Sequence, residues 1–120
     1  MSNLLVYLYP KCGTCRNAVK WLESNGHKLE IRNIFEEPPT FSELNKLVDN
    51  SGLELKKFFN VSGEVYKELG LKDKLGVMSR EEQIELLSSN GRLIKRPIVT
   101  NGEHVTVGFK EDQYAIVWAG

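Results

Sequence analysis

The chain has 120 residues, of which 41% are hydrophobic and 27% charged, so it is long enough for one domain whose core needs no disulfide bonds. Lys plus Arg and Asp plus Glu number 16 each, which leaves no overall basic field for nucleic acids or membranes. No apolar run approaches the roughly 18 residues of a membrane span, and the N-terminus lacks the basic stretch of a signal peptide. We therefore expect a cytoplasmic protein with neither a membrane nor a nucleic acid as direct partner.

The first third of the chain predicts a β-α-β unit. Asn3–Tyr9 is short and almost wholly apolar, as in a strand buried on both faces, and Pro10 ends it. Thr14–Ser24 has the apolar spacing of a helix, and Asn25-Gly26 provides its C-terminal cap. His27–Ile34 then alternates polar and apolar residues, which predicts a half-buried strand.

The middle of the chain predicts a helical insert at about residues 40–91. Thr40 and Glu43 have the spacing of a capping box, and Ser79 and Glu82 repeat it. The residues between Glu54 and Asn90 are helical in pattern throughout. No linker or repeat separates them from the rest, so residues 1–120 are predicted to form a single domain with a helical lobe.

The last part predicts a β-hairpin and a helix. Asn101-Gly102 lies between two apolar alternations, which is typical of a two-residue hairpin turn. That turn would place Ile98 opposite Val105 and Val99 opposite His104. Lys110–Trp118 then predicts a closing helix, with apolar surface from Tyr114, Ile116, Val117 and Trp118.

The only two cysteines, Cys12 and Cys15, form a C-x-x-C motif between the first strand and the first helix. A sulfur at a helix N-terminus faces unpaired backbone N–H groups, which favour the thiolate, so Cys12 is predicted to be the nucleophile. Cys15 lies one turn further on and is the predicted resolving thiol. Arg16 lies four residues after Cys12 and is expected to lower the thiol pKa or hold an anion. Gly13 is expected to allow a tight turn.

Two other interpretations of the motif remain open. A zinc site would need two more ligands, and no other Cys or His in the chain has the spacing to supply them, so no metal site is predicted. In the second interpretation the two cysteines are reduced structural thiols, because free cysteine often serves as a small buried hydrophobic residue. The two histidines, His27 and His104, are both expected at the surface.

The predicted order is β-α-β, helical insert, β-hairpin, α. With C-x-x-C after the first strand, this order indicates an α/β fold with the thioredoxin-like, or glutaredoxin-like, mixed sheet. Cys12-Gly13-Thr14-Cys15-Arg16-Asn17, together with Lys95-Arg96-Pro97-Ile98 before the hairpin, resembles the ArsC/Spx family over the whole chain. This family includes arsenate reductases and Spx-type regulators that bind RNA polymerase.

The resemblance assigns roles to individual residues. Cys12 matches the catalytic cysteine, Arg96 matches the arginine before the proline of the R-P-I element, and Pro97 is implied to be a cis proline. The predicted catalytic residues are thus Cys12, Cys15, Arg16 and Arg96, and the predicted substrate-binding residues are Lys11, Gly13, Thr14 and Pro97. Gly52 corresponds by resemblance to a glycine that contacts the polymerase, although it also has the pattern of a helix cap.

Some positions depart from the arsenate reductase pattern. In the pattern of arsenate reductases that use glutaredoxin, a serine stands where this chain has Cys15, and two further arginines hold the oxyanion. This chain has Phe58-Phe59-Asn60-Val61 and Val107-Gly108-Phe109 in those places. Each lost charge-assisted contact to an oxyanion is typically worth about 1.5–3 kcal/mol. We therefore expect thiol–disulfide exchange rather than efficient arsenate reduction.

Three functions are compatible with the motif. The preferred one is a thiol–disulfide redox protein without a cofactor, an oxidoreductase that thioredoxin or a glutathione/glutaredoxin system reduces again. The alternative is a Spx-like redox-sensing transcriptional regulator that binds the RNA polymerase α subunit, and the third is an arsenate reductase proper.

Overall fold

The structure, a computed structural model, describes residues 3–118. The chain divides into two compact units, which we call the sheet unit (Met1–Asn33 with Arg96–Gly120) and the helical unit (Ile34–Lys95). Each unit is described by itself below.

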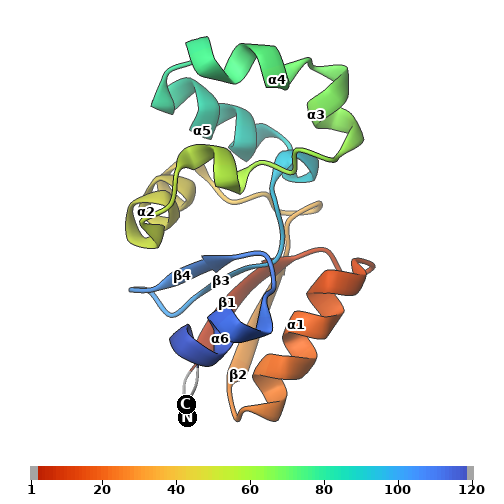
Figure 1. Cartoon of the computed structure of the whole chain (residues 1–120), viewed down its shortest axis with the longest axis vertical. Helices are drawn as coiled ribbons and strands as arrows, with labels where there is room; N and C mark the ends of the chain where they lie inside the picture. The colour runs from red at the N-terminus through yellow and green to blue at the C-terminus, as the bar shows by residue number, and fades with distance from the viewer. Residues whose placement is uncertain (1–2, 119–120) are drawn as a thin grey trace. The chain divides into compact units, whose positions relative to one another are not determined.

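The sheet unit holds one four-stranded mixed sheet with strand order β2-β1-β3-β4 (Figure 1). Strand β1 runs parallel to β2 and antiparallel to β3, and β3 runs antiparallel to β4. The predicted β-α-β, hairpin and α order is therefore confirmed. Its elements are β1 (Asn3–Leu8), α1 (Gly13–Ser24), β2 (Lys28–Asn33), β3 (Ile98–Thr100), β4 (Val105–Val107) and α6 (Glu111–Val117).

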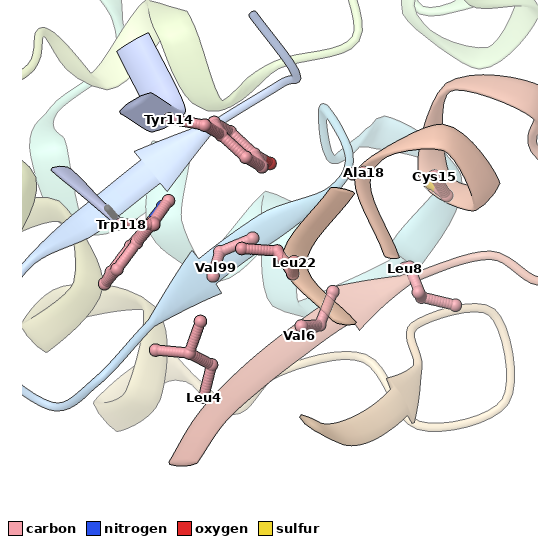
Figure 2. Close-up of a cluster of buried hydrophobic side chains, with 9 residues drawn as sticks. All are labelled: Leu4, Val6, Leu8, Cys15, Ala18, Leu22, Val99, Tyr114 and Trp118. Carbon is pink, nitrogen blue, oxygen red and sulfur yellow. The ribbon is translucent and has the colours of Figure 1, made fainter. Parts of the chain in front are cut away.

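One face of this sheet packs against α1 and α6 and forms the core of the unit (Figure 2). Successive side chains of a strand point to opposite faces, so alternate residues of β1 lie on this side. Tyr114 of α6 and Trp118, which caps this helix, close the layer, and Trp118 Nε1 donates a hydrogen bond to Thr106 Oγ1 at 3.0 Å. The buried cluster consists of Leu4, Val6, Leu8, Cys15, Ala18, Leu22, Val99, Tyr114 and Trp118. Ile116, expected to add apolar surface, is instead 84% exposed.

The hairpin differs from the prediction. Ile98 lies opposite Val107 and Val99 opposite Thr106, so the loop has four residues rather than two. The Asn101 side chain is the reason, because its Oδ1 accepts hydrogen bonds from the backbone N–H groups of Glu103 and His104 at 2.9 and 2.8 Å. An Asn side chain that binds the backbone in this way makes its own turn. The error is two residues, so each side chain still lies on the predicted face.

The helical unit consists of short helices, as predicted. The two helices that open on the predicted capping boxes, at Thr40 and Ser79, both have them. Helix α2 also ends as predicted, at Gly52. The elements are α2 (Phe41–Ser51), η1 (Leu55–Phe58), α3 (Glu64–Glu68), α4 (Leu71–Lys74), η2 (Leu75–Val77), α5 (Arg80–Ser89) and η3 (Gly91–Leu93).

Several contacts hold the helical unit together. Phe58 and Phe59 are 0% and 1% exposed and belong to the buried core. Arg80 Nη2 pairs with Asp49 Oδ1 at 2.7 Å and so links α5 to α2. Gly91 lies against the backbone of Ile34, where a Cβ atom would come within 1.9 Å of the carbonyl oxygen, so this position requires glycine. Within residues 3–118, no helix is both long and apolar enough to cross a membrane.

Candidate redox site

Cys12 is the N-cap residue of α1, which confirms its predicted place at the start of the helix. Its backbone is extended, with φ −83° and ψ 122°, and its Sγ accepts a hydrogen bond from the backbone N–H of Cys15 at 3.4 Å. A further bond, from the Cys12 N–H to the Tyr9 carbonyl oxygen at 3.0 Å, fixes the turn between β1 and the helix. The sulfur is therefore held where the first turn of the helix supplies donors.

Cys15 lies one turn along α1, on the side that faces the sheet. It is 1% exposed and belongs to the core cluster (Figure 2). Cys12 is half-buried and packs against that cluster. Both cysteines are free thiols. The more accessible sulfur is therefore the one at the helix N-terminus.

The surroundings lower the pKa of Cys12. Burial raises that pKa, but it is outweighed by hydrogen bonds from the Cys15 thiol and backbone N–H and by the charge and hydrogen bond of Arg96. The net direction is below the ordinary value of 9.0. The lowered pKa favours the thiolate form of Cys12, which is the nucleophilic form of a cysteine.

The surroundings act on Cys15 in the opposite direction. Burial is the largest cause, and the hydrogen bond with Cys12 and the Cys12 charge add to it, which together raise the pKa of Cys15 to about 12. At neutral pH Cys15 is therefore protonated and can donate its S–H to the neighbouring sulfur. The pKa values of the two cysteines in one motif are displaced in opposite directions because one cysteine caps the helix and the other lies in the core.

Arg96 and Pro97 immediately precede β3 and lie in the same unit as the cysteines. The Arg96–Pro97 peptide bond is cis, as the resemblance implied. The Arg96 guanidinium carbon lies 6.0 Å from the centre of the Tyr9 ring, a cation–π contact that orients it. The Pro97 carbonyl accepts a hydrogen bond from the Gly108 N–H at 2.8 Å, which ties this segment to the hairpin.

The other predicted substrate-site residues line the exposed side of the motif. Lys11, Gly13 and Thr14 are exposed. Arg16 is also exposed, and its Nε donates to the Pro10 carbonyl oxygen at 3.2 Å, so Arg96 is the guanidinium that acts on the Cys12 pKa. The tight turn expected at Gly13 is not formed by left-handed backbone, because Gly13 is not among the glycines with positive φ.

Gly13 instead leaves open space beside the thiol. A Cβ atom built there would meet nothing within 4 Å.

Gly52, the predicted partner-binding residue, belongs to the helical unit, where it is exposed and has φ 68°. It caps α2 in the left-handed conformation that its sequence pattern indicated.

Two expectations about single residues are wrong or incomplete. His27 is buried rather than at the surface, and its Nε2 hydrogen-bonds with the Trp118 carbonyl oxygen. Tyr114 was predicted only as apolar surface, but it is 0% exposed and donates its O–H to the Gly108 carbonyl oxygen at 2.8 Å. The partner of His27 is 91 residues away in the sequence, so no local pattern signals it, whereas the partner of Tyr114 is only six residues away. His104 is exposed as expected, and residues 3–118 contain no cluster of ligands for a metal ion.

Known structures share this architecture. A protein from Bacteroides fragilis related to the ArsC family aligns with a TM-score of 0.91 at 47% identity, over 95% of this chain and 96% of that one. The α/β fold is therefore thioredoxin-like, with the mixed sheet and helices of ArsC-type structures.

The family model ArsC matches residues 7–117, and the chain belongs to the ArsC family. It is 59% identical to "Uncharacterized protein YusI" of Bacillus subtilis (strain 168), over 98% of this chain and 99% of that protein. It is 36% identical to an arsenate reductase of Yersinia enterocolitica, over 82% of this chain and 69% of the relative. It is also 29% identical to the global transcriptional regulator Spx of Enterococcus faecalis, over 92% of this chain and 82% of the relative.

Proposed function

We propose that this protein is a thiol–disulfide oxidoreductase in which Cys12 is the nucleophile and Cys15 the resolving thiol. The observation that carries this proposal is the opposite displacement of the two thiol pKa values, lowered for Cys12 and raised to about 12 for Cys15. A low-pKa, accessible thiol attacks, and a buried, protonated thiol next to it waits for the intermediate.

The reaction has two exchange steps. The Cys12 thiolate attacks one sulfur of a substrate disulfide, a bond forms to Cys12, and the other substrate sulfur leaves as a thiolate. Cys15 then loses its proton to the solvent or to the departing thiolate and attacks Cys12, which releases the second substrate thiol. The substrate gains two electrons, and the protein is left with a Cys12–Cys15 disulfide. Thioredoxin or a glutathione/glutaredoxin system supplies two electrons to restore the dithiol.

Arg96 supports the first step by holding Cys12 as the thiolate, through its charge and a hydrogen bond. Gly13 and Thr14 leave the approach to the sulfur open, since both are exposed and Gly13 has no Cβ atom. Lys11 and Arg16 add positive charge on the exposed side, and Pro97, immediately before β3, follows Arg96 in the sequence. This arrangement needs no metal or cofactor to complete the exchange.

The test is to trap the first intermediate. Cys15→Ser, incubated with a small disulfide, is expected to accumulate a mixed disulfide at Cys12, while the wild-type protein passes on to its internal disulfide. Mass spectrometry of the unreduced protein distinguishes the two products. Cys12→Ser is the matched control and should form neither. If Cys15→Ser stays free of adducts although its Cys12 is fully reduced at the start, the proposed roles are wrong.

A second candidate is a redox-sensing regulator of transcription, favoured by the similarity to the Spx regulator of Enterococcus faecalis. In this function the Cys12–Cys15 disulfide is a switch, and exposed Gly52 contributes to the contact with the RNA polymerase α subunit. Pull-down of purified α subunit by the reduced and by the oxidised protein tests it. Absence of binding in both redox states would contradict this candidate.

Arsenate reduction proper is the least supported function, although a relative bears that name. Phe58 and Phe59 are buried apolar side chains, and Phe109 packs on Tyr114 with ring centres 4.8 Å apart, so neither segment carries the additional guanidinium of the reductase pattern. We expect arsenate-dependent turnover to be negligible with either glutaredoxin or thioredoxin as reductant. Efficient turnover would make arsenate the substrate after all.

A further inference from the structure

An apolar groove of about 270 Å³ lies beside the dithiol, within the sheet unit. Its floor and walls come from the end of β1, the first three turns of α1 and the edge strand β2. The lining residues are Leu8, Pro10, Cys15, Arg16, Val19, Lys20, Glu23 and Ile31. The end of the groove at Pro10 and Cys15 belongs to the same turn of chain that holds Cys12.

The groove exists because β2 is an edge strand and α1 only partly covers the face of β2 that carries Ile31. Ile31 pairs with Val6, so both side chains lie on the α1 face of the sheet. Val6 is 0% exposed, but Ile31, one strand further out, is 47% exposed. A half-exposed isoleucine in the floor of this groove is apolar surface that the side chain of a bound peptide can cover.

The charges on the rim of the groove are ordered along α1. Arg16 and Lys20 lie nearest the motif, and Glu23 lies at the far end. These residues are spaced four and three apart and therefore follow one helical face. They span about 10 Å at 1.5 Å per residue, which is the length of about three extended residues. The groove is thus apolar in its floor, positive near the thiol and negative further away.

We propose that this groove binds an extended segment of the protein that carries the target disulfide, with the order cysteine, acidic, apolar, basic along the segment. The inference rests on the proposed function and names the substrate class for the same site. The acidic side chain faces Arg16 and Lys20, the apolar side chain covers Ile31 and Val19, and the basic side chain faces Glu23.

The electron balance is that of the proposed exchange. The Cys12 thiolate attacks the sulfur of the bound cysteine, the disulfide of the segment breaks, and its other sulfur leaves as a thiolate. Cys15 then releases the segment as a free thiol. The segment's disulfide is reduced by two electrons as the Cys12–Cys15 disulfide forms, so the groove changes the rate through binding and not through new chemistry.

Peptide disulfides of defined sequence test the inference. Each peptide carries one cysteine as a mixed disulfide with 2-mercaptoethanol, and the probe is the rate at which it oxidises the wild-type protein, followed by alkylation and mass spectrometry. Two sets of peptides, with the apolar residue before or after the cysteine in the sequence, test both directions in which a peptide can lie along the groove. A leucine in the apolar position should raise the rate about tenfold over serine, since burying a leucine side chain in an open groove recovers part of its transfer free energy.

Variants locate the effect in the groove. Ile31→Ser should bring the leucine-to-serine rate ratio close to one, whereas Ile116→Ser, which alters an isoleucine that is 84% exposed on α6, should leave it unchanged. Lys20→Glu should reverse the preference for an acidic residue beside the cysteine. Lys28→Glu makes the same charge change on the opposite face of the sheet and should not reverse it. Equal rates for leucine and serine peptides, or a preference that survives Ile31→Ser, would overturn the proposal.

A second measurement separates this inference from the proposed function. The same peptides with alanine for cysteine are added to labelled protein, and amide NMR shifts are recorded. The leucine peptide should shift the amide signals around Val19 and Ile31, and the serine peptide should not. This result would support peptide binding in the groove even if Cys12 exchanged with no disulfide. Rapid oxidation by 2-hydroxyethyl disulfide together with no such shifts would leave the proposed function standing and refute the groove.

Discussion

Arg96 is the single residue whose charge most directly tunes Cys12. Its guanidinium lowers the Cys12 pKa by charge and by a hydrogen bond, and both effects are lost in Arg96→Gln. We expect the pH midpoint of Cys12 alkylation to move upward and the rate at neutral pH to fall by up to about tenfold, since hydrogen bonds to charged groups are worth about 1.5–3 kcal/mol before solvent screening. Arg92→Gln, which removes a guanidinium stacked on Phe35 in the helical unit, is the matched control. An unchanged midpoint in Arg96→Gln would contradict the role.

The two thiols should also differ in labelling. Cys12 has the lowered pKa and is half-buried, while Cys15 is 1% exposed and has a pKa of about 12. Iodoacetamide at neutral pH should therefore modify Cys12 at least about tenfold faster than Cys15, because only the thiolate reacts. Peptide mapping of the reduced protein measures both rates. Cys15 should remain slow in Cys12→Ser, which would show that its own environment protects it, and equal labelling would contradict the assignment.

At the scale of elements, Gly52 ends α2 in left-handed backbone, with φ 68°. Gly52→Ala should lower the free energy of unfolding by about 1 kcal/mol, since a Cβ atom disfavours this conformation, and Gly52→Asn should lower it less. Gly76→Ala is the control, because Gly76 does not have positive φ and an added Cβ meets nothing within 4 Å. Urea denaturation measures all three. If Gly52→Asn keeps the free energy of unfolding but no longer binds the RNA polymerase α subunit, Gly52 has a binding role in addition to capping α2.

The elements show which features a sequence reveals. The capping boxes at Thr40 and Ser79 were predicted because cap and partner lie three residues apart. The hairpin register was missed because the Asn101 side chain replaced a backbone turn, and buried His27 was missed because its partner, the Trp118 carbonyl, is 91 residues away. Local patterns gave the place of Cys12, but only family resemblance pointed to Arg96, whose approach to the sulfur depends on the pairing of β3 with β1.

At the scale of the whole molecule, burial of Cys15 links its protonation to folding. The pKa of Cys15 is raised from 9.0 to about 12, so above pH 9.0 the unfolded chain loses this proton and the native protein keeps it. The unfolded state then binds fewer protons, and the free energy of unfolding falls as the pH rises toward about 12. Cys12 acts in another range, because its lowered pKa contributes stability that is present above 9.0 and is lost as the pH falls through its native value.

The difference in unfolding free energy between the reduced wild-type protein and Cys15→Ser isolates this effect, since other groups that titrate in the same range are common to both. We expect that difference to fall by an amount on the order of a few kcal/mol between pH 9 and 12, at 1.36 kcal/mol per pKa unit. Cys12→Ser should retain most of the fall, because burial is the largest cause of the raised Cys15 pKa. Urea titrations at each pH under reducing conditions give the values. Parallel pH profiles for wild type and Cys15→Ser would mean that Cys15 ionises in the fold as freely as in the unfolded chain, which its place in the core does not permit.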